Sequence, residues 1–391
     1  MTIQEVLTKF HEVFGDEGSI GTFFAPGRVN LIGEHTDYNG GHVFPCALTL
    51  GIYGAMRKRD DRFLRFYSLD FPDEGITSSS LDELKPLQDK GWTAYPKGVV
   101  WAFDRRGFPL PTGFDLVIGG DIPIGSGLSS SAALEMLTGV ALRALFGFDE
   151  LSMKNLVGIG QFAENDYLGM QCGIMDQFAS GMGKAGCAIY LDTARLVHTY
   201  APLDLEDSTL VITNTKVKHE LIGSPYNERR EACALALKRF QNSLKISSLG
   251  AMTTDQFESY KDTLHDPILV KRARHAVYEN FRTIQALSAL QAGNMDRFGE
   301  LMNASHVSLR DDYEVSCPEL DLLAETAWEI PGVIGSRMTG GGFGGCTVSI
   351  VKNDSLAQFK EALTSAYQKK FDKCPEFYVV TPGDGARAIE A

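Results

Sequence analysis

The sequence predicts an α+β fold that is divided into two domains. The predicted strands and helices follow one another without the regular β–α–β alternation of a doubly wound parallel sheet. The chain has 391 residues, of which 44% are apolar and 22% charged, as is ordinary for a globular protein of two domains. The pattern of elements changes near residue 200, so we predict domains at residues 1–200 and 201–391.

The first domain is expected to mix helices and strands, beginning with an amphipathic helix. In the helix expected over residues 131–145, apolar side chains share one face at helical spacing: Leu134, Leu137, Ala141 and Leu145. The other helices are expected at residues 6–14, 95–105 and 151–168, and one more starts within residues 173–180. Strands are expected at residues 21–24, 42–56, 62–69, 114–120 and 187–191.

The second domain is expected to contain longer helices and fewer strands. Its helices are predicted at residues 228–240, 271–289, 319–327 and 356–371. Its strands are predicted at residues 210–215, 346–351 and 376–380. The segment RMTGGGFGG, residues 337–345, precedes the middle strand, and its clustered glycines allow a tight turn or a close approach to a ligand or to another loop.

Charge and cysteine content exclude several classes of partner. The net charge of −13 argues against nucleic acid and anionic membranes. The seven cysteines are scattered without a CxxC pair, which indicates a reducing cytoplasm and no zinc site. The N-terminal residues lack the apolar core of a signal peptide, and no apolar run approaches the length of a membrane span.

A glycine–serine loop between a predicted strand and a predicted helix is the strongest single feature. In GGDIPIGSGLSSSAALE, residues 119–135, Gly125 and Gly127 allow a tight turn, and Ser129, Ser130 and Ser131 supply hydroxyl donors that can cap the helix. Free N–H groups at a helix start attract phosphate. The loop matches neither GxxxxGK[ST] nor GxGxxG, so we expect a phosphate binder of another design. The alternative is a flexible loop with a serine cap.

A polar segment follows the first predicted strand. Arg28, Glu34, His35 and Asp37 lie within ten positions, beside an apolar stretch, NLIG. Carboxylates and histidine accept hydrogen bonds from sugar hydroxyls, which favours a polyol-binding segment. The alternative is a polar turn with ordinary surface charges.

A serine and an acidic residue indicate a metal site near the phosphate loop. Ser131 and Glu164 offer the hydroxyl and the carboxylate that one magnesium ion needs, with phosphate oxygens and water completing its shell. Asp176 lies in the first turn of its predicted helix. The alternatives are a solvated helix face for Glu164 and a helix cap for Asp176.

Three motifs, in order along the chain, resemble the galactokinase family of the GHMP superfamily of small-molecule kinases. PGRVNLIGEHTDYNGG (residues 26–41) resembles the galactokinase signature, PIGSGLSSSAA (123–133) the ATP loop of the superfamily, and GGGFGGC (340–346) its third motif. GIMDQ (173–177) and YNERR (226–230) also match. The resemblance covers essentially the whole chain and implies a two-domain GHMP kinase fold with the active site in the cleft between the domains.

The resemblance also implies a role for each site residue. Asp176 is expected to be the base and Arg28 to stabilise the transferring phosphoryl group. The residues expected to face the sugar are Glu34, His35, Thr36, Asp37 and Tyr226. Those expected to bind ATP are Ser68, Gly125, Ser126, Gly127, Leu128, Ser129, Ser130 and Ser131, while Ser131 and Glu164 are expected to bind Mg²⁺.

The implied activity is ATP-dependent phosphorylation of the C1 hydroxyl of galactose by a cytoplasmic monomer. A sugar 1-kinase for N-acetylgalactosamine, arabinose or galacturonate is the near alternative, because the sequence does not outline the pocket around C2 and C5. A non-catalytic galactose sensor that regulates transcription is disfavoured, since Ser131 and the two following alanines are intact and Asp176 is present.

Overall fold

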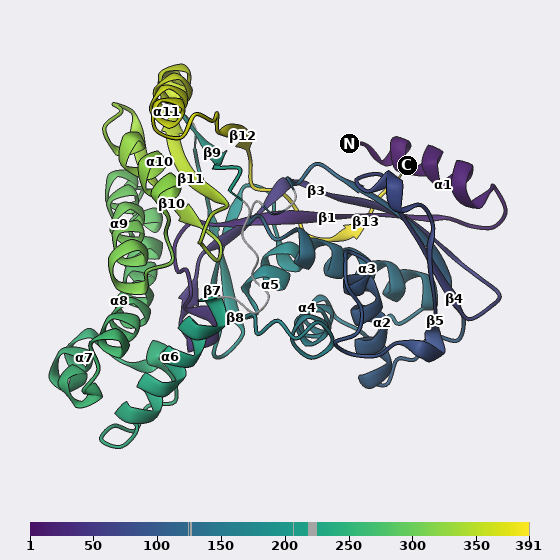
Figure 1. The fold of residues 1–391 in the computed structure, drawn as a ribbon, viewed down its shortest axis with the longest axis horizontal. Helices are drawn as coiled ribbons and strands as arrows, with labels where there is room; N and C mark the ends of the chain where they lie inside the picture. The colour runs from purple at the N-terminus through teal and green to yellow at the C-terminus, as the bar shows by residue number, and fades with distance from the viewer. Residues whose placement is uncertain (124, 126, 206, 218–224, 391) are drawn as a thin grey trace.

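A long antiparallel strand pair forms the spine of the first part of the molecule. The computed structural model describes residues 1–390 apart from 124, 126, 206 and 218–224 (Figure 1). Its largest sheet has six strands, in which β4 and β6 are parallel and the other neighbours antiparallel. In sheet order these are β13 (Arg387–Ala388), β1 (Gly21–Asn30), β3 (Pro45–Lys58), β6 (Phe114–Gly120), β4 (Phe63–Ser68) and β5 (Thr77–Ser80).

Helices cover both faces of this sheet. α1 (Ile3–Phe14) begins with a capping box between Thr2 and Glu5 and packs on one face through Val6 and Phe10. The opposite face carries the main core and four helices: α2 (Ala94–Arg105), α3 (Ser130–Phe146), α4 (Met153–Phe162) and α5 (Met175–Met182). The sheet is therefore an internal layer, and α3 brings the end of the glycine–serine loop against β1 (Figure 1).

The second part of the molecule is built around a smaller antiparallel sheet. In sheet order its strands are β10 (Val333–Thr339), β11 (Cys346–Lys352), β9 (Ser208–Asn214) and β12 (Glu376–Val380). Its helices are α6 (Pro225–Phe240), α7 (Thr254–Tyr260), α8 (Pro267–Gln291), α9 (Met295–Ser308), α10 (Pro318–Trp328) and α11 (Leu356–Phe371). Alternate residues of β9 face opposite sides: Val211 packs with α10 and α11, whereas Leu210 and Ile212 join the core that includes α9.

The two parts share structure rather than meeting only at a surface. A three-stranded sheet of β2 (His42–Val43), β7 (Cys187–Asp192) and β8 (Val197–Pro202) lies between them and contacts α8. One continuous core cluster contains both Val29 of β1 and Val348 of β11. The last strand, β13, returns to pair with β1, so the two chain ends lie near each other (Figure 1). The division at residue 200 stays a prediction.

Most predicted elements are present, with differences at their ends. The strand predicted at 21–24 continues to Asn30, because the segment PGRVN pairs with β3 across a register shift between Pro26 and Arg28. The helix predicted over 151–168 is α4 followed by a π-helical turn, Ala163–Tyr167, which carries Glu164. Elements that were not predicted are β5, β8, β10, β13, α7 and α9.

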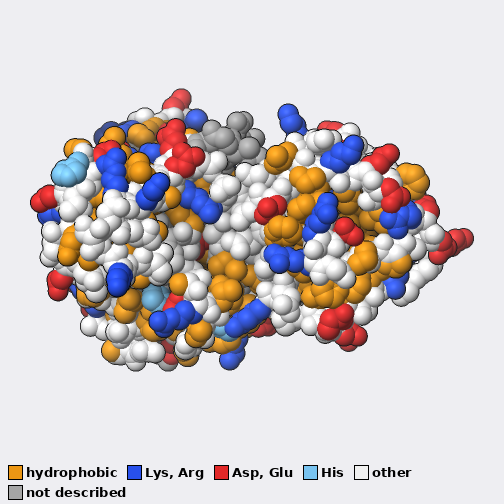
Figure 2. Space-filling model, turned by 90° about the horizontal axis from the view of Figure 1, so that it is seen from below, with side chains coloured by type: hydrophobic (Ala, Val, Ile, Leu, Met, Phe, Trp, Pro, Cys, Tyr) orange, Lys and Arg blue, Asp and Glu red, His pale blue; other side chains and the backbone are white. Residues whose placement is uncertain are grey.

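In the part of the chain that the structure describes, no helix combines the length and apolar character that crossing a bilayer requires. Seen from below, acidic and basic side chains are interspersed over both parts of the molecule, without a continuous basic patch on that face (Figure 2).

Candidate active site

A cavity of about 540 Å³ collects most of the predicted site residues. Residues from both halves of the chain line it, so the predicted site lies where the two parts meet. The predicted residues that line it are Arg28, Glu34, His35, Asp37, Ser68, Gly125, Gly127, Ser129, Ser130, Ser131, Glu164, Asp176 and Tyr226. Ser126 lies outside the described residues.

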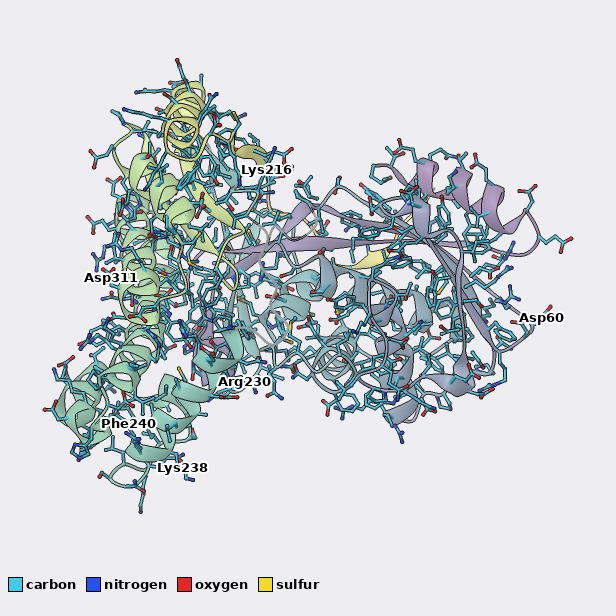
Figure 3. All side chains as sticks on the ribbon, in the orientation of Figure 1. Asp60, Lys216, Arg230, Lys238, Phe240 and Asp311 are labelled. Carbon is cyan, nitrogen blue, oxygen red and sulfur yellow. The ribbon has the colours of Figure 1, made fainter. Side chains whose placement is uncertain are left out.

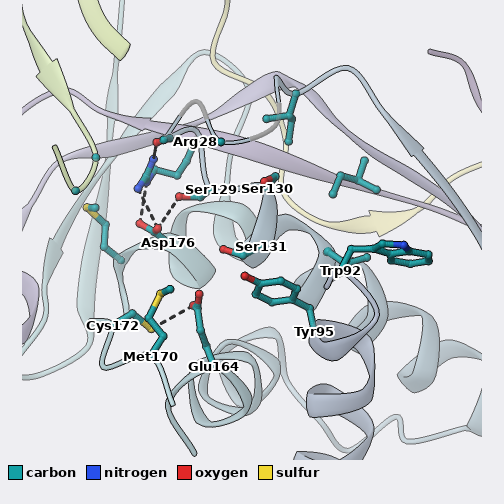
Figure 4. Close-up of a pocket in the computed structure, with 18 of the residues that line it drawn as sticks. Arg28, Trp92, Tyr95, Ser129, Ser130, Ser131, Glu164, Met170, Cys172 and Asp176 are labelled. Atoms are coloured by element: carbon teal, nitrogen blue, oxygen red, sulfur yellow. Dashed lines mark hydrogen bonds and ion pairs between the residues drawn. The ribbon is translucent and has the colours of Figure 1, made fainter. Parts of the chain in front are cut away.

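The centre of the cavity is an ion pair between Arg28 of β1 and Asp176 of α5 (Figure 4). Arg28 donates from Nε to Asp176 Oδ1 at 2.8 Å and from Nη2 to Oδ2 at 2.9 Å, a bidentate geometry that fixes both side chains. Burial opposes the charge of Arg28, but the carboxylates of Asp176 and Glu34 raise its pKa. The guanidinium side chain is 4% exposed and the Asp176 side chain 29%, so the carboxylate is the more accessible partner.

The glycine–serine loop is tied to this pair. Arg28 Nη1 donates to the carbonyl oxygen of Gly127 at 2.6 Å, and its backbone N–H donates to the carbonyl of Leu128 at 3.1 Å. Gly125 and Gly127 have φ values of 71° and 78°, which confirms the tight turn predicted for them. The loop that enters α3 is therefore held directly beside the acidic side chain of Asp176.

The predicted helix cap by Ser129 is wrong. Ser129 is the N-cap residue, but it has the left-handed φ and ψ of 59° and 47°, and its side chain makes no capping hydrogen bond. Its hydroxyl instead donates to Asp176 Oδ2 at 2.5 Å. Because the left-handed conformation turns the side chain away from the helix start, the hydroxyl supports the ion pair rather than the helix.

Two residues predicted to bind ligands do not line the cavity. The Thr36 hydroxyl is buried and lies 2.8 Å from the carbonyl oxygen of Gly33 and 2.6 Å from that of His42, so its one proton is shared between these two acceptors. The Leu128 side chain is 1% exposed and packs in the main core. Thr36 therefore holds the polar segment in shape, and Leu128 anchors the glycine–serine loop.

Glu34 is a buried carboxylate held by the third motif. Its Oε1 accepts from the backbone N–H of Gly340 at 2.6 Å and forms a 3.5 Å ion pair with Arg337, which is fully buried. Burial raises the pKa of Glu34, and Arg337 and Arg28 oppose that shift. Gly340 also packs on the phosphate loop, since a Cβ there would lie 2.9 Å from the Gly127 carbonyl oxygen. The third motif thus contacts the first and second motifs together.

Asp37 faces the same cavity from the turn after β1. Its Oδ1 accepts from the backbone N–H of Tyr38 at 2.9 Å, and its Oδ2 from that of Met175 at 3.4 Å. Burial and the nearby charge of Asp176 raise the pKa of Asp37 to about 6. The two carboxylates face one cavity, and the proximity of Asp176 makes ionisation of Asp37 unfavourable.

His35 is a neutral hydrogen-bonding group in a ring of aromatic residues. Its ring centre lies 4.8 Å from that of Tyr313 and 5.5 Å from that of Tyr226, and its Nδ1 is 2.7 Å from the Tyr38 hydroxyl. Burial and His275 lower the pKa of His35 to about 3. Its Nε2 has no hydrogen-bond partner among the described residues.

Ser131 and Glu164 face one another across the cavity from α3 and the π-helical turn (Figure 4). Burial and the charge of Asp176 raise the pKa of Glu164 to about 7, while hydrogen bonds from Cys172, Gln177 and Ser131 oppose this. Gln177 Nε2 donates to Glu164 Oε2 at 2.6 Å and to Glu135 Oε2 at 2.9 Å. Two buried carboxyl groups therefore share one amide, a costly arrangement that a cation beside Glu164 would relieve.

The end of the cavity away from the Arg28–Asp176 pair is apolar. Trp92 and Tyr95 border it near Ser131, as Figure 4 shows. Further apolar lining residues are Ile52, Phe71, Ile118, Ile122 and Leu134. Ser68 is 1% exposed, and its hydroxyl accepts from the backbone N–H of Asp70 at 3.1 Å. A flat apolar group joined to phosphates fits this end, with the phosphates toward Ser131.

Sequence reasoning missed the residues that support the site from behind. Glu135 ends the stretch 119–135 that contains the glycine–serine loop, and Gln177 is the last residue of GIMDQ, so both lie in segments that the sequence already marks. Arg337 and Glu279 lie far along the chain, and Glu279 accepts from the backbone N–H of Gly33 at 2.9 Å. Only the fold brings these distant charges together, although the run RMTGGG marked the neighbourhood of Arg337.

Family models match three parts of this chain. The galactokinase galactose-binding signature matches residues 8–58, the GHMP kinases N terminal domain residues 94–184, and the GHMP kinases C terminal domain residues 286–369. Together they contain most of the site residues described above.

Curated relatives match along the full chain. A galactokinase of Ligilactobacillus salivarius is 50% identical over 97% of this chain and 98% of its own length. A galactokinase of Exiguobacterium sibiricum is 51% identical over 100% of this chain and 99% of its own length.

Solved structures match the fold. The crystal structure of the Lactococcus lactis galactokinase complexed with galactose has a TM-score of 0.97 and 46% identity, covering 99% of this chain and 100% of that chain. The Methanococcus jannaschii mevalonate kinase has a TM-score of 0.61 at 19% identity, covering 96% of this chain and 100% of that chain, which shows a shared fold alone.

Proposed function

Since the chain belongs to the galactokinase family, we propose that the residues of its cavity catalyse transfer of the terminal phosphoryl group of ATP to the C1 hydroxyl of galactose. The chain is an ATP-dependent kinase that phosphorylates galactose. The observation that carries the assignment of residues is the Arg28–Asp176 pair, which joins the glycine–serine loop to the polar segment at the centre of the cavity.

Galactose binds at the end of the cavity where hydrogen-bonding groups gather. Glu34, Asp37 and Tyr226 line this end, together with the neutral His35 ring. Carboxylates accept hydrogen bonds from hydroxyls, which suits Glu34 and Asp37 to a sugar. The aromatic ring of Tyr226 lies 5.5 Å from that of His35 and bounds the sugar on one side.

The nucleotide binds at the other end. Gly125, Gly127 and the serines 129–131 hold the phosphates at the start of α3, where the helix dipole favours negative charge. The apolar end bordered by Trp92 and Tyr95 takes the adenine ring. This orientation directs the terminal phosphate toward Asp176 and the sugar.

Asp176 acts as the base. Its carboxylate is held by Arg28 and Ser129 and is the exposed member of the pair, so it can accept the proton of the attacking hydroxyl. Arg28 makes it a weaker base, which suffices because phosphoryl transfer passes through a loose transition state in which the hydroxyl loses its proton late. Arg28 also stabilises charge on the transferring group.

Ser131 and Glu164 fit a bound Mg²⁺. Both offer hard oxygen donors, and they lie on facing elements of the cavity wall. The described residues contain no group of three or more His, Cys, Asp or Glu side chains that could hold a metal, so phosphate oxygens and water complete the shell. When bound, Mg²⁺ neutralises charge on the ATP phosphates.

We infer that the chain acts as a monomer, with the residues assigned to galactose, to the phosphates and to the catalytic base on one copy. The seven cysteines are all free, which supports the reducing environment of the cytoplasm.

A sugar panel tests the proposed function. The purified chain is assayed with ATP against galactose, 2-deoxygalactose, glucose, N-acetylgalactosamine, arabinose and galacturonate, and phosphorus NMR locates the phosphate in each product. We expect C1 phosphorylation of galactose and 2-deoxygalactose, and poor use of glucose, because a polar contact at C4 discriminates far better than apolar fit. Comparable kcat/KM for glucose and galactose, or phosphate on another carbon, would overturn it.

A further inference from the structure

Arg230 connects the start of α6 to the turn that precedes α5. Its Nη1 donates to the carbonyl oxygen of Gln171 and, at 3.5 Å, to that of Cys172. Its guanidinium carbon also lies 5.8 Å from the ring centre of Tyr38. Figure 3 shows Arg230 at the inner end of α6, whereas Lys238 and Phe240 lie at the outer end. The side chain therefore bridges the two parts of the molecule.

The turn that Arg230 holds is part of the cavity wall. Met170, Cys172 and Gly173 line the cavity, although Arg230 itself does not. The backbone at Gly173 lies directly against Asp37, since a Cβ there would fall 1.8 Å from Asp37 Oδ2. A shift of this turn would therefore move the surface that the Asp37 carboxylate packs against.

The same turn leads straight into the catalytic helix. Two residues after Gly173, the backbone N–H of Met175 donates to Asp37 Oδ2 at 3.4 Å, and Asp176 follows. The turn thus sets the position of the Asp37 carboxylate, assigned to sugar binding, relative to the Asp176 carboxylate, assigned as the base.

Helix α6 gives Arg230 a rigid support. Cys233, Ala236 and Phe240 are at most 1% exposed and pack in the core of the second part. Tyr226, one turn before Arg230, lines the cavity. A charged donor makes stronger hydrogen bonds to carbonyl oxygens than a neutral one, so the guanidinium can fix the turn against competing water.

We propose that Arg230 is a positioning residue for galactose. It holds the 171–173 turn against Asp37 and keeps Asp37, Asp176 and Tyr226 in one arrangement, without touching the substrate. The proposal rests on the sugar-binding role assigned to Asp37 under the proposed function. The turn contacts Asp37 through its backbone at Gly173, and among the described residues it contacts Glu164 only through the Cys172 thiol, which donates to Glu164 Oε2 at 3.2 Å. Loss of Arg230 therefore weakens galactose use more than ATP use, whereas a purely stabilising arginine would affect both equally.

Arg230→Ala tests the proposal against Arg239→Ala as a matched control. Arg239 lies on the same helix and also donates to a backbone carbonyl, that of Leu264, but within the second part and away from the cavity. Steady-state kinetics give KM for galactose and for ATP, and urea denaturation gives the stability of each variant. We expect Arg230→Ala to raise KM for galactose about ten-fold, the effect of losing one charged hydrogen bond, and to raise KM for ATP by a smaller factor. We expect Arg239→Ala to change neither KM.

Arg230→Lys supplies a milder second variant. The ammonium keeps the charge but loses the planar fork, so its KM for galactose should lie between those of wild type and Arg230→Ala. The proposal is wrong if both Arg230 variants keep the wild-type KM for galactose, or if the KM for galactose and the KM for ATP rise by the same factor. A poorly folded Arg230→Ala leaves Arg230→Lys to decide by the same criterion. If the proposed function itself were wrong, the wild-type chain would fail to phosphorylate galactose.

Discussion

Replacing Asp37 by asparagine should stabilise the free protein while weakening its use of galactose. The carboxyl is half-buried and faces Asp176, which together raise its pKa from the usual 3.8 to about 6. The asparagine side chain would keep the shape of the aspartate but carry no charge. The substitution therefore removes an electrostatic cost from the folded state and, at the same time, a hydrogen-bond acceptor from the sugar site.

The size of the effect follows from the pKa difference. The folded state binds this proton more tightly than the unfolded chain, so the ionised carboxyl destabilises the folded state as pH rises from about 3.8 through 6. Above that range the full cost is about 3 kcal/mol, since one pKa unit corresponds to about 1.4 kcal/mol. Solvent around the half-buried carboxyl lowers this figure, and the amide loses part of the long 3.4 Å bond from Met175. A net gain of about 1–2 kcal/mol remains at pH 8.

Urea denaturation without ligands measures this gain. Asp37→Asn should be more stable than wild type at pH 8, and the pH-dependent part of the difference should be lost below about pH 3, where the wild-type carboxyl is protonated in both the folded and the unfolded state. In kinetics at pH 8 the same variant should show a higher KM for galactose by about five-fold or more, because a sugar hydroxyl loses its acceptor. A variant that is no more stable at pH 8, or a stability difference that does not vary with pH, would refute this reasoning.

The remaining predictions concern the metal and the turn after β1. Ser131→Ala and Glu164→Ala should each weaken use of magnesium–ATP and recover in part with excess Mg²⁺; unchanged Mg²⁺ dependence in both would remove them from the metal site. Thr36→Val should lower the free energy of unfolding by about 1–3 kcal/mol, since the carbonyls of Gly33 and His42 lose the hydroxyl proton that they share, with KM for galactose changed less than two-fold. A large rise in the KM for galactose with unchanged stability would instead indicate that Thr36 binds the sugar.

Short motifs predicted the cavity residues well because each motif is a contiguous stretch whose chemistry is visible in its letters. Arg28, Asp176 and the serines 129–131 come from segments far apart in sequence, and the fold places them together. A motif does not separate residues that face a ligand from those that hold the loop. Thr36 and Leu128 lie in the motifs, but one side chain is turned to backbone carbonyls and the other to the core.

Secondary structure was predictable where a hydrophobic pattern is strong. Strand β5, with the sequence TSSS, has no apolar alternation and forms because it pairs with β4 at the edge of the sheet. The helix expected through residue 168 ends in a π-helical turn that places Glu164 in the cavity, a change of hydrogen-bond register that no periodicity reveals. Buried charge partners such as Arg337 and Glu34 are distant in sequence and depend wholly on tertiary packing.

The central claim is that Asp176 takes the proton of the attacking hydroxyl while Arg28 stabilises the transferring phosphoryl group. A rapid-quench measurement of a single turnover in Asp176→Asn, saturated with galactose and ATP, tests it most directly. We predict that the rate of phosphoryl transfer falls by about 10²- to 10⁴-fold while galactose binding changes little. Arg28→Ala, which is severe under either mechanism, serves as the comparison. If Asp176→Asn keeps most of the wild-type single-turnover rate, the proton leaves through phosphate or water, and Asp176 only positions the sugar.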